Sequence, residues 1–231
     1  MKRFWKQAAA VPDERGWSVE IDGKPLRTPA RKPLVVPAEK LARAIADEWS
    51  AAGQTVDPGA MPLTGLANAA IDRVATDPNA FAASLARYGE SDLACYRADN
   101  PRELAGRQAK SWDELLAWAR RRFDIDFCTT SGILHVQQPE PTIQRLAQAV
   151  GSFDPFRLAA LSPLVTISGS LVAALAVTER QLSPEQAWHA VTIDEQWQRE
   201  QWGPDADAEA ALEARWRDFF AAARFLELLD G

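Results

Sequence analysis

Among the side chains that could take part in catalysis, this sequence has two histidines, two cysteines and 32 acidic residues. A nucleophilic hydrolase needs a base beside its nucleophile, and the sequence has no Gly-x-Ser-x-Gly motif to accompany His135 or His189. His135 lies in an apolar stretch and His189 follows Trp188, where a partly apolar imidazole is typical of a structural or surface residue. We therefore expect neither histidine to be catalytic.

The sequence indicates no phosphate site and no metal site. It contains neither Gly-x-x-x-x-Gly-Lys-Ser/Thr nor Gly-x-Gly-x-x-Gly, and Ser168-Gly169-Ser170 lies in an apolar helical pattern, where small residues favour close helix packing. The acidic pairs lack EF-hand spacing, and Cys95 and Cys128 form neither a Cys-x-x-Cys pair nor a cluster. We expect no cofactor, no metal and a reducing compartment.

One carboxylate, that of Glu195, stands out by its neighbours. If residues 184–203 form a single helix at about 100° per residue, one stripe carries Trp188, Val191, Glu195, Gln198 and Trp202. Glu195 then lies between two indoles, where an unpaired carboxylate is costly. It could pair with Arg199 one turn later, with an arginine of another helix, or with a cation or backbone donors of a binding partner.

Composition and charge describe an ordinary folded protein of 231 residues, 47% of them hydrophobic, with a net charge of −6. This acidity disfavours a nucleic-acid binder. Basic residues outnumber acidic ones ten to five over residues 1–43, and acidic residues outnumber basic ones twelve to five over residues 179–231. Such asymmetry suits a partner of mixed charge. The apolar run 158–177 contains Pro163 and three small residues, and therefore indicates a buried helix pair rather than insertion into a membrane.

Strand patterns occupy residues 16–36. Trp17, Val19 and Ile21 alternate with polar residues, and Asp22-Gly23 is a two-residue hairpin turn before the extended residues 24–28. Another short extended piece, residues 34–36, precedes Pro37, which opens a helix with Leu41, Ile45 and Trp49 at i, i+4 and i+8. The apolar stripe of this helix is expected to pack on the adjacent sheet.

The rest of the chain reads as helix, with Ile133–Val136 as the one stretch that could be either a strand or an extended connector. Prolines mark the helix starts at residues 78, 101, 139, 155, 184 and 204, and the last helix covers residues 205–229. We predict an α+β fold with a small β-containing N-terminal domain, residues 1–80, and a larger all-helical C-terminal domain, residues 81–231. No low-complexity linker separates the two.

Several short phrases, read in order, resemble the assembly chaperones of the α subunit of F-type ATP synthase in mitochondria and α-proteobacteria. These phrases are Arg3-Phe4-Trp5-Lys6, residues 22–29, Glu48-Trp49, Asp57-Pro58, residues 61–64, residues 92–97, Gln108 with Trp112, Gln138-Pro139, residues 168–171, residues 194–198 and Trp202-Gly203. They span nearly the whole chain, so the resemblance is to a family rather than to a fold.

The resemblance implies a chaperone, not an enzyme, that uses no nucleotide. It implies binding of the free α subunit over the surface that later meets the β subunit, and release as the ring assembles. In the family, an acidic residue precedes an aromatic-Gln pair and a Trp-Gly in the C-terminal domain, and the resemblance places this residue at Glu195. Asp194 is one residue away. We predict that the partner-binding surface consists of Glu195, Asp194, Trp197, Gln198 and Trp202. Gln196-Trp197 departs from the Glu-Tyr expected of mitochondrial members.

The chain begins almost at the Arg-Phe-Trp phrase, which predicts a bacterial cytoplasm rather than import into mitochondria, and a monomer is expected. The leading alternative function is a small hydrolase or lyase that uses a carboxylate pair between the domains. A third is a general adaptor without a role in ATP synthase assembly.

Overall fold

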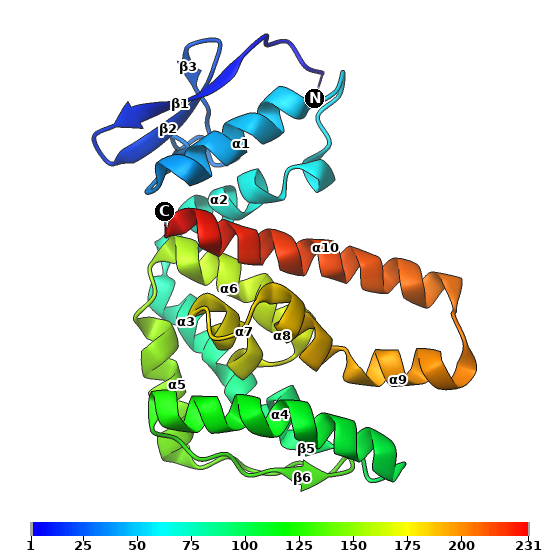
Figure 1. Cartoon of the computed structure of the whole chain (residues 1–231). Helices are drawn as coiled ribbons and strands as arrows, with labels where there is room; N and C mark the ends of the chain where they lie inside the picture. The colour runs from blue at the N-terminus through cyan, green and yellow to red at the C-terminus, as the bar shows by residue number, and fades with distance from the viewer. Residues whose placement is uncertain (1, 231) are drawn as a thin grey trace. The chain divides into compact units, whose positions relative to one another are not determined.

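The computed structural model describes residues 2–230, which divide into two units, each with its own buried core (Figure 1). Unit 1 consists of the described residues of Met1–Pro78, Asp154–Ala160 and Ala221–Gly231, and unit 2 of Asn79–Phe153 and Leu161–Phe220. A small strand-containing region followed by a mostly helical one confirms the predicted α+β class. The domain boundary at residue 80 stays a prediction, and two later segments group with the first unit.

The sheet of unit 1 is antiparallel and is centred on β2 (Gly16–Ile21). β2 pairs along its length with β1 (Ala8–Asp13), and also with the short strands β3 (Lys24–Pro25) and β4 (Val35–Val36). The predicted turn at Asp22-Gly23 is present, with φ of 48° and 75°, the left-handed values that a two-residue hairpin requires. The sequence analysis missed β1, because three alanines and a proline carry little strand preference.

Two helices complete the N-terminal part of unit 1. α1 (Glu39–Ala51) contacts β1 and β2, as predicted, and buries Leu41 and Ile45. From the last turn of α1, the Glu48 carboxylate accepts hydrogen bonds from the backbone N–H groups of Leu63 and Thr64, each at 2.8 Å. These groups belong to the first turn of α2 (Pro62–Asp72). Burial raises the pKa of Glu48, and the hydrogen bonds offset part of this rise.

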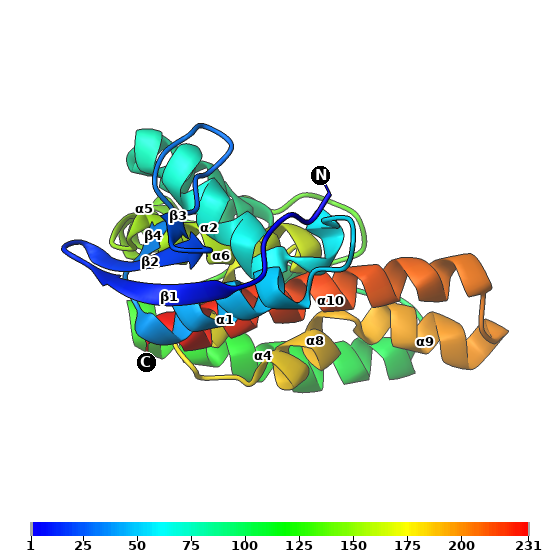
Figure 2. The ribbon, with the colours of Figure 1, turned by 90° about the horizontal axis from the view of Figure 1, so that it is seen from above.

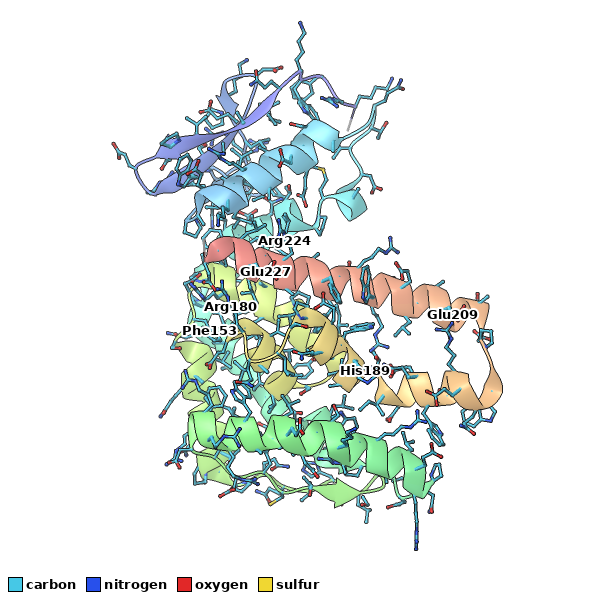
Figure 3. All side chains as sticks on the ribbon, in the orientation of Figure 1. Phe153, Arg180, His189, Glu209, Arg224 and Glu227 are labelled. Atoms are coloured by element: carbon cyan, nitrogen blue, oxygen red, sulfur yellow. The ribbon has the colours of Figure 1, made fainter. Side chains whose placement is uncertain are left out.

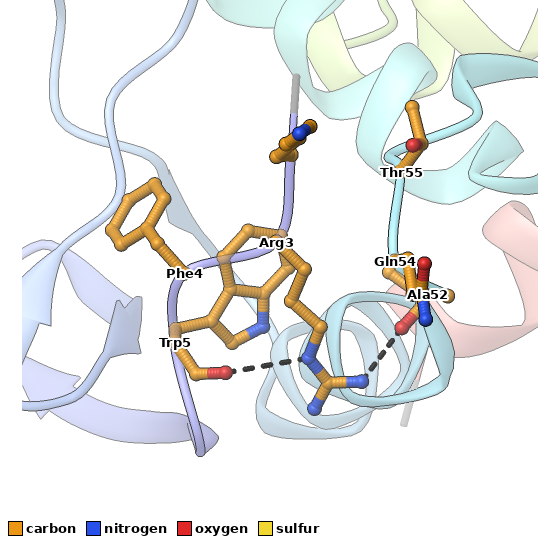
Figure 4. A pocket seen from close by; sticks show the side chains of 8 residues that line it. Arg3, Phe4, Trp5, Ala52, Gln54 and Thr55 are labelled. Carbon is orange, nitrogen blue, oxygen red and sulfur yellow. Dashed lines mark hydrogen bonds between the residues drawn. The ribbon is translucent and has the colours of Figure 1, made fainter.

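The Arg-Phe-Trp phrase at the start of the chain closes the C-terminal end of α1. The Arg3 Nη1 group donates to the carbonyl oxygen of Ala52 at 2.6 Å (Figure 4). It also donates to the carbonyl oxygen of Ser50 at 3.1 Å. The Trp5 indole donates to the carbonyl of Trp49 at 3.1 Å, and the two indoles pack with centroids 5.1 Å apart. A cation at a helix C-terminus satisfies carbonyls that lack helical partners, so this phrase has a local structural role.

Unit 2 consists mainly of helices, which pack around one central helix that is almost entirely buried. The helices that lie in it wholly or partly are α3 (Pro78–Ala86), α4 (Arg102–Phe123), α5 (Glu140–Gly151), α6 (Pro155–Ser168), α7 (Leu171–Thr178), α8 (Pro184–Val191), α9 (Ile193–Trp202) and α10 (Ala206–Leu229). Residues 171–177 of α7 are all buried, and α7 contacts α4 and α8. A helix that is apolar all round belongs in a core, and α7 is the centre of this one.

Two phrases of the sequence meet at the start of α7. The Asp92 carboxylate is fully buried and accepts hydrogen bonds from Ser170 Oγ at 2.8 Å, Val172 N at 2.9 Å and Ala94 N at 3.0 Å. Ser170 Oγ in turn accepts from Ala173 N at 3.0 Å and caps the helix. Gly169, with a φ of 68°, ends α6. Residues 168–170 therefore form a helix break, and the expected helix-packing role of these small residues is wrong.

Two other expectations for unit 2 are decided by the structure. Ile133–Val136 is an extended connector rather than a strand, and the neighbouring strand β6 (Thr130–Ser131) pairs in parallel with β5 (Tyr96–Arg97). The predicted pair of helices around residues 158–177 is present as α6 and α7. Among the described residues, no helix has both the length and the apolar character that crossing a bilayer requires.

Candidate partner-binding site

The helix expected over residues 184–203 is broken at Thr192. Its φ and ψ of −114° and 20° separate α8 from α9, and its hydroxyl donates to the carbonyl of Trp188 at 2.7 Å. Figure 2 shows the two helices following one another beside α4, which both contact. The predicted single helix is therefore wrong, but Trp188 and Glu195 of the predicted stripe both face α10: the Arg215 guanidinium lies 5.9 Å from the Trp188 ring and donates a hydrogen bond to Glu195.

Asp194 and Trp197 lie on the side of α9 that packs on α4. The Asp194 carboxylate accepts a hydrogen bond from Gln108 Nε2 at 2.7 Å, and Gln108 Oε1 accepts from Ala98 N at the same distance. The Trp197 ring is 7% exposed and lies 4.8 Å from the Arg107 guanidinium. These contacts occupy both side chains inside unit 2, and their predicted part in partner binding remains a prediction.

Glu195 faces α10, on a different side of α9. Its Oε1 accepts a hydrogen bond from Arg215 Nη1 at 2.9 Å, so the pairing is with an arginine of another helix. Arg199, the other cation considered for this role, pairs with Glu209 at 3.0 Å. Arg215 also donates to the Ile167 carbonyl at 3.0 Å, which ties it to the end of α6. The side chains of Glu195 and Arg215 are 37% and 39% exposed, so solvent reaches this ion pair.

A groove of about 400 Å³ lies between α9 and the first turns of α10. Gln198 and Trp202 line its α9 side together with Glu195, at the i, i+3 and i+7 positions of one helix face. Trp202 is 78% exposed. Glu195–Arg215 and Arg199–Glu209 bridge the two helices, and Figure 3 labels Glu209 near the outer end of α10. The predicted site thus divides into two groups, of which Glu195, Gln198 and Trp202 share the groove.

The α10 side of the groove was missed by the sequence analysis. Ala208, Ala211, Leu212 and Arg215 line it. Burial along α10 decreases toward its N-terminus: Phe219 is fully buried, whereas Trp216 is 39% exposed and Leu212 is half-buried. The apolar residues Ala208, Ala211 and Leu212 have the i, i+3, i+4 spacing of one helix face, which the sequence shows. The same spacing does not show whether another helix of the chain covers that face.

The charges around the groove are mostly negative. Residues 200–214 contain five acidic residues and no lysine, arginine or histidine. Asp205 uses its carboxylate to accept from Ala208 N at 2.8 Å, which caps α10. Glu200 pairs with Arg107 of α4 at 2.7 Å. The turn between α9 and α10 therefore presents an excess of carboxylates beside an apolar groove.

Among the described residues, the pKa is raised for two carboxyl groups, Glu48 of unit 1 and Asp92 of unit 2, and neither lines this groove. Burial raises both pKa values, and hydrogen bonds from helix N-terminal N–H groups lower them in part. Each carboxylate is thus engaged in holding a helix start. Over residues 2–230, no three or more His, Cys, Asp or Glu side chains gather as a metal ion would need.

Comparison with known proteins decides the family. The model of the ATP12 chaperone protein family matches residues 2–120. The structure of Atp12 from Paracoccus denitrificans is 42% identical, covers 99% of this chain and 98% of its own, and superposes with a TM-score of 0.94. The chain belongs to the ATP12 chaperone family. An Agrobacterium tumefaciens protein of known structure, 40% identical, covers 99% of this chain and 86% of its own with the same TM-score.

A curated ATP12 relative is the mitochondrial protein atp12 of Schizosaccharomyces pombe, 26% identical over 90% of this chain and 75% of its own length. Membership in the ATP12 family implies a chaperone with a role in ATP synthase assembly. The matched region of the family model ends in α4, so the α9–α10 groove lies outside it.

Within this ATP12 chain, the phrases that carried the resemblance contact one another. Glu48 accepts hydrogen bonds from Leu63 and Thr64 of residues 61–64. Asp92 accepts one from Ser170 of residues 168–171, and Asp194 accepts one from Gln108. The Trp112 indole donates to the Ala190 carbonyl at 2.7 Å in the buried core. Most of these residues therefore hold the fold, and Glu195 and Trp202 differ from them by facing an open groove.

Proposed function

We propose that this ATP12-family protein binds the free α subunit of F-type ATP synthase, prevents its aggregation and releases it as the α/β ring assembles. The observation that carries the proposal is the groove between α9 and α10, which leaves an apolar helix face uncovered beside an exposed indole. A chaperone needs such a surface, because an unassembled subunit exposes apolar area that associates wrongly until its partner arrives.

We propose that Glu195, Gln198 and Trp202 contact the α subunit directly, while Asp194 and Trp197 support α9 from the α4 side. Tryptophans and buried charges are typical of the residues that dominate binding energy. Arg215 already holds Glu195 at 2.9 Å, so a cation of the partner can exchange with it without leaving a carboxylate unpaired.

The proposal includes a monomer that carries out no catalysis and binds no nucleic acid, and that works in a bacterial cytoplasm. The two carboxyls with raised pKa sit at helix starts, which gives little support to a hydrolase or lyase. The two cysteines are free thiols, in keeping with a reducing compartment.

The direct test is refolding of purified α subunit with and without this protein, followed by light scattering and size exclusion. We expect suppressed scattering and a discrete complex. The absence of both at micromolar concentrations would reject the proposal. A general adaptor would suppress the scattering of unrelated unfolded proteins equally well, so one such protein belongs in the same experiment.

The Glu195→Lys variant tests the site. It places a second cation beside Arg215 and should weaken the complex by about tenfold or more, because like charges at a binding surface repel. The fold should survive, since the pair is over one-third exposed. Glu114→Lys, at an exposed position of α4, is the matched control and should leave the complex unchanged. A large fall in melting temperature for Glu195→Lys alone would assign Glu195 a structural role instead.

A further inference from the structure

The groove is the uncovered continuation of a core helix face. In α10, Phe219 is fully buried and packs against Trp188 with ring centroids 5.5 Å apart. On the same face, Leu212 lies about two turns earlier and is half-buried, and Ala208 lies about three turns earlier and is exposed. The apolar pattern continues toward the N-terminus of α10 after its intramolecular partner has ended. An apolar face of this kind is complete only when something covers it.

Both walls of the groove are helices, which determines the backbone conformation of whatever fills it. The N–H and C=O groups of α9 and α10 are engaged along their own helices, so neither wall offers a strand edge. An extended peptide laid there would have its own backbone groups buried without partners, at a cost for each. A helix satisfies its backbone internally and needs only an apolar face.

The charges around the groove determine the sign of its ligand. Of the five carboxylates in residues 200–214, Glu200 pairs with Arg107 of α4, whereas Asp205 and Glu209 line the groove. The two cations of the lining, Arg199 and Arg215, are each paired with a glutamate across the groove. Asp207 and Glu213 are exposed on the same turns of α10. A ligand with cationic side chains beside its apolar face would meet an attractive potential here, and an acidic ligand a repulsive one.

Resting on the proposed function, we infer that the α9–α10 groove holds a basic amphipathic helix of the partner, with aliphatic side chains in the groove and Lys or Arg against its acidic rim. α9 has ten residues, which span about 15 Å, so a helical segment of about three turns matches the groove. This inference goes beyond the identity of the partner, because it states which kind of segment the groove recognises.

Two synthetic peptides test this inference on the full-length protein. Both carry leucines at i, i+3, i+4 and i+7 over 16 residues; one has lysines at the flanking positions and the other has glutamates. Fluorescence anisotropy of the labelled peptides measures their affinities. We expect the lysine peptide to bind at least about tenfold more tightly, and added salt to reduce this preference. Equal binding of the two peptides, or preference for the glutamate peptide, would overturn the inference.

A pair of matched variants places the peptide in the groove. Ala208→Trp fills the groove from its α10 side, whereas Ala210→Trp makes the same change about 200° around the helix, outside the groove lining. Both alanines are exposed, so the two variants should fold alike. We expect Ala208→Trp to weaken lysine-peptide binding about tenfold and Ala210→Trp to change it less than about twofold. Equal effects of the two variants would show that the peptide binds elsewhere, against the inference.

The same variants separate this inference from the proposed function. If the lysine peptide fails to bind while Ala208→Trp abolishes the complex with the α subunit, the groove holds the α subunit by another kind of segment and only the inference is wrong. If wild-type protein binds the lysine peptide in the groove but forms no complex with the α subunit, the proposed partner is wrong and the helix preference stands.

Discussion

Asp92 and Glu195 are carboxylates of the same unit in opposite surroundings. Asp92 is fully buried, and three N–H or O–H groups at the start of α7 and near β5 donate to it. Glu195 is over one-third exposed, makes one described ion pair and lines an open groove. Asp92 is surrounded by buried donors, whereas Glu195 is surrounded by one arginine and solvent. The difference assigns stability to the α7 end of the unit and binding to the α9–α10 end.

The largest expected effect is that of Asp92→Ala. It leaves the N–H groups of Ala94 and Val172 and the Ser170 hydroxyl without their acceptor in the core, and should lower the free energy of unfolding by about 3–5 kcal/mol. Urea unfolding measures this. Asp218→Ala, at an exposed position of α10, is the control and should change it by less than about 0.5 kcal/mol. If Asp92→Ala lowers the free energy of unfolding by less than about 1 kcal/mol, Asp92 does not have the stabilising role that distinguishes it from Glu195.

The pH dependence of stability sharpens the same contrast. Burial raises the pKa of Asp92 above its ordinary value of 3.8, so the folded chain binds this proton more tightly than the unfolded chain. Its contribution to stability is therefore greatest below pH 3.8 and falls as the pH rises through the folded-state pKa. The Asp92→Asn variant lacks this proton. The difference in unfolding free energy, wild type minus variant, should decrease as the pH rises across this window. An increase would mean that folding lowers the pKa of Asp92 instead of raising it.

A much smaller change in stability than that of Asp92→Ala is expected for Glu195→Gln. It removes one charge from a solvent-exposed ion pair and keeps the shape of the side chain, so the free energy of unfolding should fall by less than about 1 kcal/mol. The complex with the α subunit should nevertheless weaken, which size exclusion or scattering would show. If Glu195→Gln destabilises the fold as much as Asp92→Ala while leaving the complex intact, the two carboxylates have the same role and the comparison fails.

Local patterns predicted many elements. The Asp22-Gly23 turn, the stripe of α1 and the proline-marked helix starts all depend on residues close in sequence, and the structure has them within two residues. β1 was missed because alanine has a low intrinsic preference for strands, and this segment is a strand because it pairs with β2. The break at Thr192 was missed because residues 184–203 are compatible with one helix, and packing on α4 decides otherwise.

The candidate site was predictable on one side only. The i, i+3, i+7 spacing was enough to put Glu195, Gln198 and Trp202 on one face. It could not identify Arg215 as the partner of Glu195, since the two residues are 20 apart in sequence and meet only through the turn between α9 and α10. Asp194, one residue from Glu195, faces α4 because adjacent helical residues point about 100° apart.

By itself, the sequence determined the fold class, the positions of most helices and, through phrases spread along the chain, the family. These depend on short-range preferences and on residue identity. The tertiary structure alone decided that the phrases hold one another in place, that α10 leaves Ala208 and Leu212 uncovered, and which charged residues line that opening. The physical reason is that burial is a property of what packs against a residue, and an apolar pattern is the same whether its cover comes from this chain or from a partner.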